Sequence, residues 1–318
     1  MHSIGIDVGS GITQWASGSK RGSFPSLAAI WDVASMSGTL ENPWLVKVGS
    51  IGTTYLVGPK VPLVTRDVAD SLTDEWAGSD PWLALLYAAV YDAGLLPSKD
   101  PISVAIGVPQ ALYRAVNKGL VERLSGVHRF SVYGVEYLLD MKVGVYPQAS
   151  AAMAAVDELS DSEIVGLIDV GTYTTGLSVM QLVSGEPVIN HTMCGGISRG
   201  TSVLARHVQS YLDTHHQTRM DLDRVYPLLD RRVVKIKGRE IDLRHAVDSA
   251  CLSLSSEIEE AADRVFRGGS EMEVIALVGG GGKYVLPRLD KVFPQLFMPE
   301  SSEWSVVMGL SAFAAAHA

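Results

Sequence analysis

The stretch Ile4-Gly5-Ile6-Asp7-Val8-Gly9-Ser10-Gly11 opens the chain, and a second stretch of the same kind, Gly166-Leu167-Ile168-Asp169-Val170-Gly171-Thr172-Tyr173-Thr174-Thr175-Gly176, lies near its middle. In each stretch, the apolar residues before an Asp are typical of a buried strand, and the Gly, Ser and Thr residues after it are typical of a tight hairpin. Glycine lets the backbone N–H groups of such a hairpin approach an anion. One copy would mean little, because a strand followed by Asp-x-Gly arises by chance in many β-rich proteins. Two copies, near the starts of two halves, predict a duplicated phosphate-binding fold.

A third glycine-rich turn follows a strand late in the chain, in the stretch Val274-Ile275-Ala276-Leu277-Val278-Gly279-Gly280-Gly281-Gly282-Lys283. The apolar residues predict a buried strand, and we expect a helix to begin near Tyr284. The consecutive glycines leave bare backbone, against which a flat ring or a phosphate can lie. A flexible linker is the alternative interpretation, but linkers rarely follow directly on a fully apolar strand.

The composition is typical of a soluble globular protein. The chain has 318 residues, of which 47% are hydrophobic and 19% charged, so it can bury one or two sizeable cores and is long enough for about two domains. No apolar run approaches the roughly 18 residues that a membrane-spanning helix needs. The N-terminus enters a strand directly, without the segments of a signal peptide, and we therefore expect a cytoplasmic protein.

The charge and the cysteines exclude several kinds of partner. A net charge of −9 argues against direct, non-specific binding to DNA or to anionic lipid, because such binding depends on clustered Lys and Arg. A link to DNA would need an adaptor. Cys194 and Cys251 are far apart and lack metal-site spacing, so we expect small buried residues. The basic stretch 231–239 alternates with Val and Ile, which favours a half-buried β-hairpin over a docking surface. We expect His215-His216 to lie at a solvated helix end.

Hydrophobic periodicity predicts alternating strands and helices in both halves of the chain. The expected strands are 3–8, 13–17, 45–48, 55–57, 102–108, a pair within 129–145, 164–169, 175–182, 187–194 and 274–278. The expected helices are 81–93, 112–124, 149–158, 199–212, 243–266 and 306–316. Each half begins with a hairpin, and ligands of such α/β folds bind at the loop ends of the strands.

The three glycine-rich segments, in this order, resemble the nucleotide site of the actin/Hsp70/sugar-kinase superfamily. Within it the chain is most similar to the plasmid-segregation actins of the ParM/StbA type and their archaeal relatives. Four shorter segments extend this resemblance over nearly the whole chain: Phe24-Pro25-Ser26-Leu27, Tyr55-Leu56-Val57-Gly58, Ile106-Gly107-Val108-Pro109 and Tyr146-Pro147-Gln148-Ala149-Ser150-Ala151-Ala152.

The resemblance implies a fold and a domain division. The fold would be α/β and actin-like, a duplicated ribonuclease H-like fold in which two facing α/β domains enclose a nucleotide cleft. Domain I would comprise residues 1–147 plus 303–318, because the final helix of such folds returns to the first domain. Domain II would comprise residues 148–302.

The resemblance also implies site residues for ATP or GTP with Mg²⁺. Asp7 and Asp169 would hold the cation, partly through water, as Mg²⁺ prefers beside phosphate oxygens. The two phosphate loops would bind the nucleotide's phosphates, and the glycine turn its adenosine, through Gly9, Ser10, Gly11, Gln14, Gly171, Thr172, Tyr173, Thr174, Gly279, Gly280, Gly281 and Gly282.

Gln148 is the expected catalytic residue together with Asp169, because the resemblance places it where actins hold the Gln that positions the attacking water. Without the resemblance, Gln148 could equally be an ordinary first residue of a helix. Two positions depart from the family. Gln14 replaces a Lys seven residues after the first Asp, which removes a charge contact to phosphate, and Gly176 replaces an Asp found in many segregation actins.

The expected function is a nucleotide-dependent, filament-forming ATPase (or GTPase) whose hydrolysis is coupled to polymerisation. Its partners would be copies of itself in a head-to-tail homopolymer and a DNA-binding adaptor for plasmid segregation, with no direct contact to nucleic acid or membrane. Two alternatives stay open. A small-molecule kinase needs a carboxylate base, for which Asp67, Asp70 and Asp74 are weak candidates in an expected loop or exposed helix. A nucleotide-switched scaffold or activator needs binding without turnover.

Overall fold

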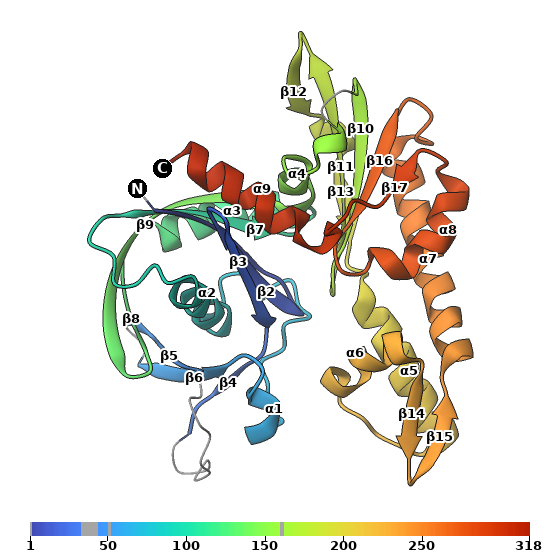
Figure 1. Ribbon diagram of the computed structural model, residues 1–318, viewed down its shortest axis with the longest axis horizontal. Helices are drawn as coiled ribbons and strands as arrows, with labels where there is room; N and C mark the ends of the chain where they lie inside the picture. The colour runs from blue at the N-terminus through green and yellow to red at the C-terminus, as the bar shows by residue number, and fades with distance from the viewer. Residues whose placement is uncertain (1, 33–43, 50–51, 160–161) are drawn as a thin grey trace. The chain divides into compact units, whose positions relative to one another are not determined.

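The computed structural model of the chain describes residues 2–32, 44–49, 52–159 and 162–318 (Figure 1). Its residues form two compact units. Unit 1 comprises residues 1–158 and 303–318, and unit 2 comprises residues 159–302. Unit 2 is therefore inserted, as one continuous segment, into the chain that builds unit 1.

Unit 1 is built on a sheet of nine described strands in the order β3-β2-β1-β7-β9-β8-β5-β6-β4. β7 lies parallel to both β1 and β9, and the other neighbours are antiparallel. All seven residues of β7 are buried, as expected of a central parallel strand covered on both faces. The strands are β1 Ser3–Val8, β2 Ile12–Ser17, β3 Lys20–Pro25, β4 Ala28–Ile30, β5 Trp44–Val48, β6 Thr53–Val57, β7 Ile102–Val108, β8 Gly126–Val132 and β9 Val135–Pro147.

Helix α2 is the centre of the unit 1 core. Figure 1 shows α2 inside the curve of the sheet, and all residues from Trp82 to Val90 are buried. A helix that is apolar on every side can be stable only when it is enclosed in this way. The helices of unit 1 are α1 Val61–Val64, α2 Asp80–Asp92, α3 Tyr113–Leu124, α4 Gln148–Met153 and α9 Ser305–Ala316.

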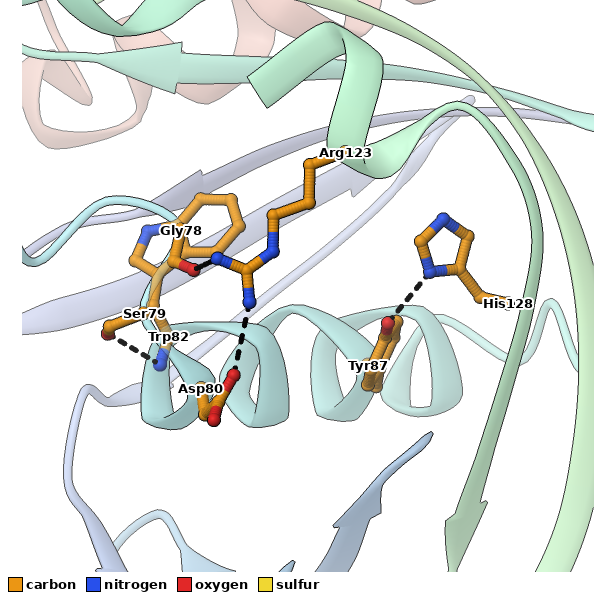
Figure 2. Close-up of polar contacts among 7 residues, drawn as sticks. All are labelled: Gly78, Ser79, Asp80, Trp82, Tyr87, Arg123 and His128. Atoms are coloured by element: carbon orange, nitrogen blue, oxygen red, sulfur yellow. Dashed lines mark hydrogen bonds and ion pairs between the residues drawn. The ribbon is translucent and has the colours of Figure 1, made fainter. Parts of the chain in front are cut away.

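Polar contacts at the start of α2 and in its second half help to fix its position (Figure 2). Ser79 caps the helix by accepting a hydrogen bond from Trp82 N. Arg123 of α3 donates to the carbonyl oxygen of Gly78 and to Asp80 Oδ1, the latter at 3.1 Å. Further along, the Tyr87 hydroxyl lies 2.9 Å from Nδ1 of His128 on β8, so α2 is tied to two neighbouring elements.

Helix α9 brings the end of the chain back to unit 1. It packs on β1 and on α4, and glycines allow both approaches. A Cβ on Gly309 would lie 1.8 Å from the carbonyl oxygen of Ala151, and one on Gly5 would lie 2.3 Å from Ser311 N. Because α4 is held in this way, residues 148–158 belong to unit 1, whereas the resemblance implied a second domain that begins at Gln148.

Unit 2 repeats the opening pattern of unit 1. Its main sheet has the order β12-β11-β10-β16-β17, with β13 paired to β11. β10 forms an antiparallel hairpin with β11 and lies parallel to β16, just as β1 pairs with β2 and β7. The elements are β10 Ile164–Val170, β11 Thr175–Val183, β12 Glu186–Ile189, β13 Gly195–Ile197, α5 Thr201–His216, α6 Leu222–Arg231, β14 Val233–Ile236, β15 Arg239–Asp242, α7 Arg244–Phe266, β16 Val274–Val278, α8 Gly282–Val292 and β17 Leu296–Phe297.

Several expected elements have different bounds. The strand expected over 187–194 ends at Ile189, because the Asn190 side chain accepts a hydrogen bond from Thr192 N and turns the chain into a short 3₁₀ helix. The helix expected over 149–158 ends at Met153. The sequence patterns did not predict β3, β4, β13, β17, α1 and α6. The region around Asp67, Asp70 and Asp74 is a loop between α1 and α2.

Three local expectations concern unit 2. The basic stretch does form a hairpin, β14–β15, so that prediction is confirmed. His215 is exposed at the end of α5, as expected, but His216 is half-buried against Tyr211. Cys194 and Cys251 are free thiols that are half-buried, not fully buried.

Substitution of Gly309 tests the packing of α9. Gly309→Ala should lower the free energy of unfolding by about 1–3 kcal/mol, because its methyl group would overlap the Ala151 carbonyl. Gly119→Ala is the matched control. A Cβ on Gly119, in α3, meets no atom within 4 Å, so this change should stabilise by about 0.4–1 kcal/mol. Urea unfolding measures both, and equal effects of the two changes would contradict this packing.

Candidate functional site

The first glycine-rich loop connects β1 to β2, and two serines hold its carbonyl groups. The Ser71 hydroxyl donates to the carbonyl oxygen of Ser10 at 2.6 Å. The backbone N–H of Ser26 donates to the carbonyl oxygen of Gly11 at 2.9 Å. The hydroxyl of Ser26 is itself held, 2.9 Å from that of buried Thr13. The loop is therefore fixed from the protein side.

A hydrogen bond that fixes a carbonyl group also fixes the direction of the N–H group in the same peptide group. In a planar trans peptide group the C=O and N–H bonds point in opposite directions. The Ser10 carbonyl is directed at Ser71, so the N–H of Gly11 in the same peptide group points away from Ser71. Gly9 permits the tight turn, because a Cβ there would lie 2.8 Å from the Ile12 carbonyl oxygen. The loop can thus direct N–H groups at an anion.

Asp7 of β1, just before this loop, is in contact with Gln148, the first residue of α4. Gln148 Nε2 donates to Asp7 Oδ1 at 2.7 Å. Gly107 makes room for the contact, because a Cβ there would lie 3.1 Å from Gln148 Cγ and 3.3 Å from Asp7 Oδ1. Burial raises the pKa of Asp7 from 3.8 to about 6, and the hydrogen bond from Gln148 opposes that rise. The structure thus brings together two site residues that are 141 positions apart in the chain.

The second loop, between β10 and β11, is held by the first turn of α5. Thr201 N donates to the Gly171 carbonyl at 3.0 Å, and Ser202 N donates to the Thr172 carbonyl at 2.9 Å. By the same peptide geometry, the N–H groups of Thr172 and Tyr173 point away from α5. A Cβ on Gly200 would lie 2.5 Å from the Gly171 carbonyl oxygen, so only glycine fits before the helix.

The four-glycine turn lies against the second loop. Gly281 N donates to the Val170 carbonyl at 2.9 Å. Gly279 has a φ of +84°, and a Cβ there would lie 2.5 Å from Asp169 Oδ1. Gly280 faces open space, because a Cβ there would meet no atom within 4 Å. Unit 2 therefore gathers all of the site residues predicted for its half, with α8 beginning at Gly282, two residues earlier than expected.

Gln14 and Gly176, the two positions at which the sequence differs from the family that it resembles, occupy equivalent places in the two sheets. Gln14 lies directly opposite Asp7 in the β1–β2 pair, and Gly176 lies directly opposite Asp169 in the β10–β11 pair. Side chains at directly opposite positions of an antiparallel pair lie on the same face and within contact distance. In both halves, the residue beside the strand-end carboxylate is therefore uncharged.

The supporting residues Ser71, Gly200, Thr201 and Ser202 were missed by the sequence analysis, and Ser26 was noticed without a role. A signal exists for the second loop: Gly200-Thr201-Ser202 has the composition of a helix start. No local signal marks Ser71, which reaches Ser10 across 61 positions.

Within the described residues, no group of three or more His, Cys, Asp or Glu side chains could hold a metal ion. Each unit offers one strand-end carboxylate, Asp7 in unit 1 and Asp169 in unit 2. Mg²⁺ is a metal that is bound by one or two carboxylates together with phosphate and water. None of the helices in the described part of the chain is long and apolar enough to cross a bilayer.

Two family models match the chain. The N-terminal domain of actin-like proteins matches residues 5–150, and the C-terminal domain of the archaeal MreB-like actin homologues matches residues 167–291. Together they span most of the sequence, and each contains one of the two loops. No curated protein sequence matches the chain.

Solved structures of related proteins share the fold over the full length. A non-polymerisable quadruple mutant of pCBH ParM is 20% identical, with a TM-score of 0.84 and 99% of each chain covered. ParM in a 15-stranded filament from Clostridium botulinum is 21% identical, with a TM-score of 0.82 and 99% of each chain covered. The archaeal actin homologue Ta0583 is 19% identical, with a TM-score of 0.81, 99% of this chain and 100% of that chain covered. At these identities the likeness establishes the fold, which is the one predicted from the sequence.

Replacement of Asp7 by Asn tests the buried carboxylate. Because the folded pKa is raised, the folded chain keeps a proton between about pH 4 and pH 6 that the unfolded chain releases, and the ligand-free protein loses stability as the pH rises through this window. Asp7→Asn keeps the acceptor for Gln148 and removes the charge. Its free energy of unfolding should exceed that of the wild type by up to about 3 kcal/mol at pH 8 and match it below about pH 4. Parallel pH profiles in urea unfolding would contradict this.

The glycine turn provides a matched pair of substitutions. Gly281→Ala should destabilise the protein by about 1–3 kcal/mol, because its Cβ would lie 2.5 Å from Val170 Cγ1 and 2.8 Å from Thr201 Cγ2. Gly280→Ala should change stability by less than about 0.5 kcal/mol, since its Cβ meets nothing. Thermal unfolding of the two ligand-free variants separates these outcomes, and the described geometry is wrong if both are destabilised alike.

Proposed function

We propose a function from one premise, that this chain belongs to the actin-like proteins. The function that we propose for the protein is that of a nucleotide-dependent, filament-forming ATPase that moves or positions a cargo in the cytoplasm. Structures of related proteins were solved with ADP, with ATP and with AMPPNP, and one relative was solved as a filament. The cargo that we propose is plasmid DNA, held through a DNA-binding adaptor.

The observation that carries this proposal is the way both loops are held. In each, donors from the protein side engage the loop carbonyls, which directs backbone N–H groups toward the opposite side. Fixed N–H groups next to glycines are suited to the oxygens of a nucleotide's phosphates. We assign phosphate binding to Gly9, Ser10 and Gly11 of the first loop and to Gly171, Thr172, Tyr173 and Thr174 of the second loop.

Bound Mg²⁺ would neutralise phosphate charge, and Asp7 and Asp169 are the carboxylates that we assign to it. Gln148, held by its hydrogen bond to Asp7, would orient the attacking water by its amide, since an amide positions water without acting as a strong base. Gly280 and its neighbours would provide open backbone for the nucleoside, which we propose to be adenosine, with guanosine as the alternative.

A nucleotide-switched scaffold is the second candidate. It is favoured by Gln14 and Gly176, because each half lacks a charged residue opposite its strand-end Asp. The loss of a cation beside the phosphates would weaken binding or slow hydrolysis. A small-molecule kinase has less support. Asp70 Oδ1 accepts a hydrogen bond from Leu72 N, which is the ordinary role of an Asp in a turn.

The test is light scattering with simultaneous phosphate release after Mg-ATP or Mg-GTP is added to the purified protein, with negative-stain microscopy. The wild type should form filaments and release phosphate. Asp169→Ala should abolish assembly, and Gln148→Ala should slow phosphate release about 10²-fold while filaments still form. Asp67→Ala, which removes an exposed loop carboxylate, is the control and should behave as the wild type.

Each result decides between the candidates. Tight nucleotide binding without scattering, over a range of protein and salt concentrations, would favour the switched scaffold and overturn the filament. Normal phosphate release from Gln148→Ala would remove its water-positioning role. A loss of turnover in Asp67→Ala would instead direct attention to a kinase.

A further inference from the structure

The helix that carries Gln148 is short and depends on its surroundings for its position. α4 has six residues, and Pro147 before it has no side-chain group that could cap the helix. An isolated helix of this length is not stable in water, so its orientation is set by the contacts around it. The orientation matters, because Gln148 is the first residue of α4 and any rotation of the helix moves its amide.

Helix α9 holds α4 from one side. A Cβ on Gly309 would lie 1.8 Å from the Ala151 carbonyl oxygen, so the backbones of the two helices are in contact there. This contact keeps α4 from moving away but leaves it free to rotate about the line of contact. A second contact, from another direction, is needed to fix the direction of the Gln148 side chain.

Gln110 provides the second contact. The Ser150 hydroxyl donates to Gln110 Oε1 at 3.2 Å, across 40 positions of the chain. Successive residues of an α-helix point about 100° apart, so the Ser150 side chain and the Ala151 backbone lie on different sides of α4. The contacts with α9 and with Gln110 together hold α4 against both translation and rotation.

Gln110 itself lies on a well-fixed part of unit 1. It follows β7, which is buried over its whole length, and it lies in the turn that leads into α3. In this turn the Pro109 carbonyl oxygen accepts hydrogen bonds from Leu112 N at 3.0 Å and from Tyr113 N at 3.1 Å. The ring of Pro109 also restricts its backbone φ. The Gln110 side chain can therefore serve as a fixed reference for α4.

The side chain of Gln148 crosses the end of the same strand. A Cβ on Gly107 of β7 would lie 3.1 Å from Gln148 Cγ and 3.3 Å from Asp7 Oδ1. Gln148 Nε2 donates to that same oxygen of Asp7 at 2.7 Å. The end of β7 thus lies against the contact between Asp7 and Gln148, and the turn that follows β7 carries Gln110. The fixed reference and the residue that it orients are both at this end of the sheet.

We propose that Gln110 is a positioning residue for nucleotide hydrolysis: through Ser150 it fixes the rotation of α4 and so directs the Gln148 amide at the attacking water. Neither Gln110 nor Ser150 is among the residues assigned to nucleotide, metal or water. The inference rests on the proposed function, because it requires that Gln148 orients that water. An error in orientation lowers the rate of the chemical step and leaves substrate binding largely unchanged.

Steady-state phosphate release with Mg-ATP tests this role. Gln110→Ala and Ser150→Ala should each lower kcat about five- to tenfold, with KM within about twofold of the wild type. The double variant should be no slower than either single variant, because both changes break the same hydrogen bond. Ser150→Thr keeps the hydroxyl and should restore the wild-type rate. The matched control is Ser256→Ala, which removes a hydroxyl that donates to Leu252 within α7 and should leave kcat unchanged.

A background without Gln148 provides a sharper test. When Gln110→Ala is added to Gln148→Ala, kcat should change by less than about twofold, because no amide is left for Gln110 to orient. Hydrogen exchange of residues 148–153 in the ligand-free protein is an independent measure. The exchange should become faster in Gln110→Ala and in Ser150→Ala but not in Ser256→Ala. Thermal unfolding verifies that each variant is folded.

The outcomes separate this inference from the proposed function. If Gln148→Ala slows phosphate release and Gln110→Ala does not, Gln110 has no positioning role while the assignment of Gln148 stands. A slow Gln110→Ala with a normal Ser150→Ala would mean that Gln110 contacts the reaction directly, which overturns its action through α4. Additive losses in the double variant would also overturn it. If Gln148→Ala itself releases phosphate at the normal rate, the proposed role of Gln148 fails and this inference fails with it.

Discussion

The site depends on a constraint of the peptide group itself. Because C=O and N–H point in opposite directions within a peptide group, a loop directs its N–H groups toward one side only when hydrogen-bond donors on the other side hold its carbonyl groups. Ser71 and the backbone of Ser26 do this for the first loop, and the start of α5 does it for the second. The glycines permit the backbone path, but the donors behind the loops determine which way the backbone dipoles face. The two halves therefore reach the same arrangement with different supporting elements.

The sequence predicts the parts of this protein that local patterns encode. Buried strands such as β7 and β16 consist almost wholly of apolar residues, and they were placed with the bounds that the structure has. The duplicated hairpins and the glycine turn were likewise recognisable from residue order alone. The short elements β4, β13 and α1 were missed, because three or four residues carry too little periodicity to be distinguished from a loop.

The site was predictable as a set of segments and not as a set of contacts. Nothing near Gln148 in the sequence indicates that its amide lies 2.7 Å from Asp7, since that distance depends on the register of β1, β7 and β9. The position of α4 was missed for the same reason: its place in unit 1 follows from Gly309, more than 150 residues later, which lets α9 approach Ala151. Contacts of this range are set by tertiary packing.

The return of α9 also has a consequence for synthesis of the chain. The hydroxyl of Ser103 donates to the Ala314 carbonyl across 211 positions, and β1 has α9 against it. Unit 1 therefore lacks a layer of its core until residues 303–318 have been made. Unit 2 is contiguous, so on the ribosome it can complete its fold first, although its first residue is made after 158 residues of unit 1. The part of the molecule that begins first is thus the part that is finished last, and its exposed sheet face needs protection in the interval.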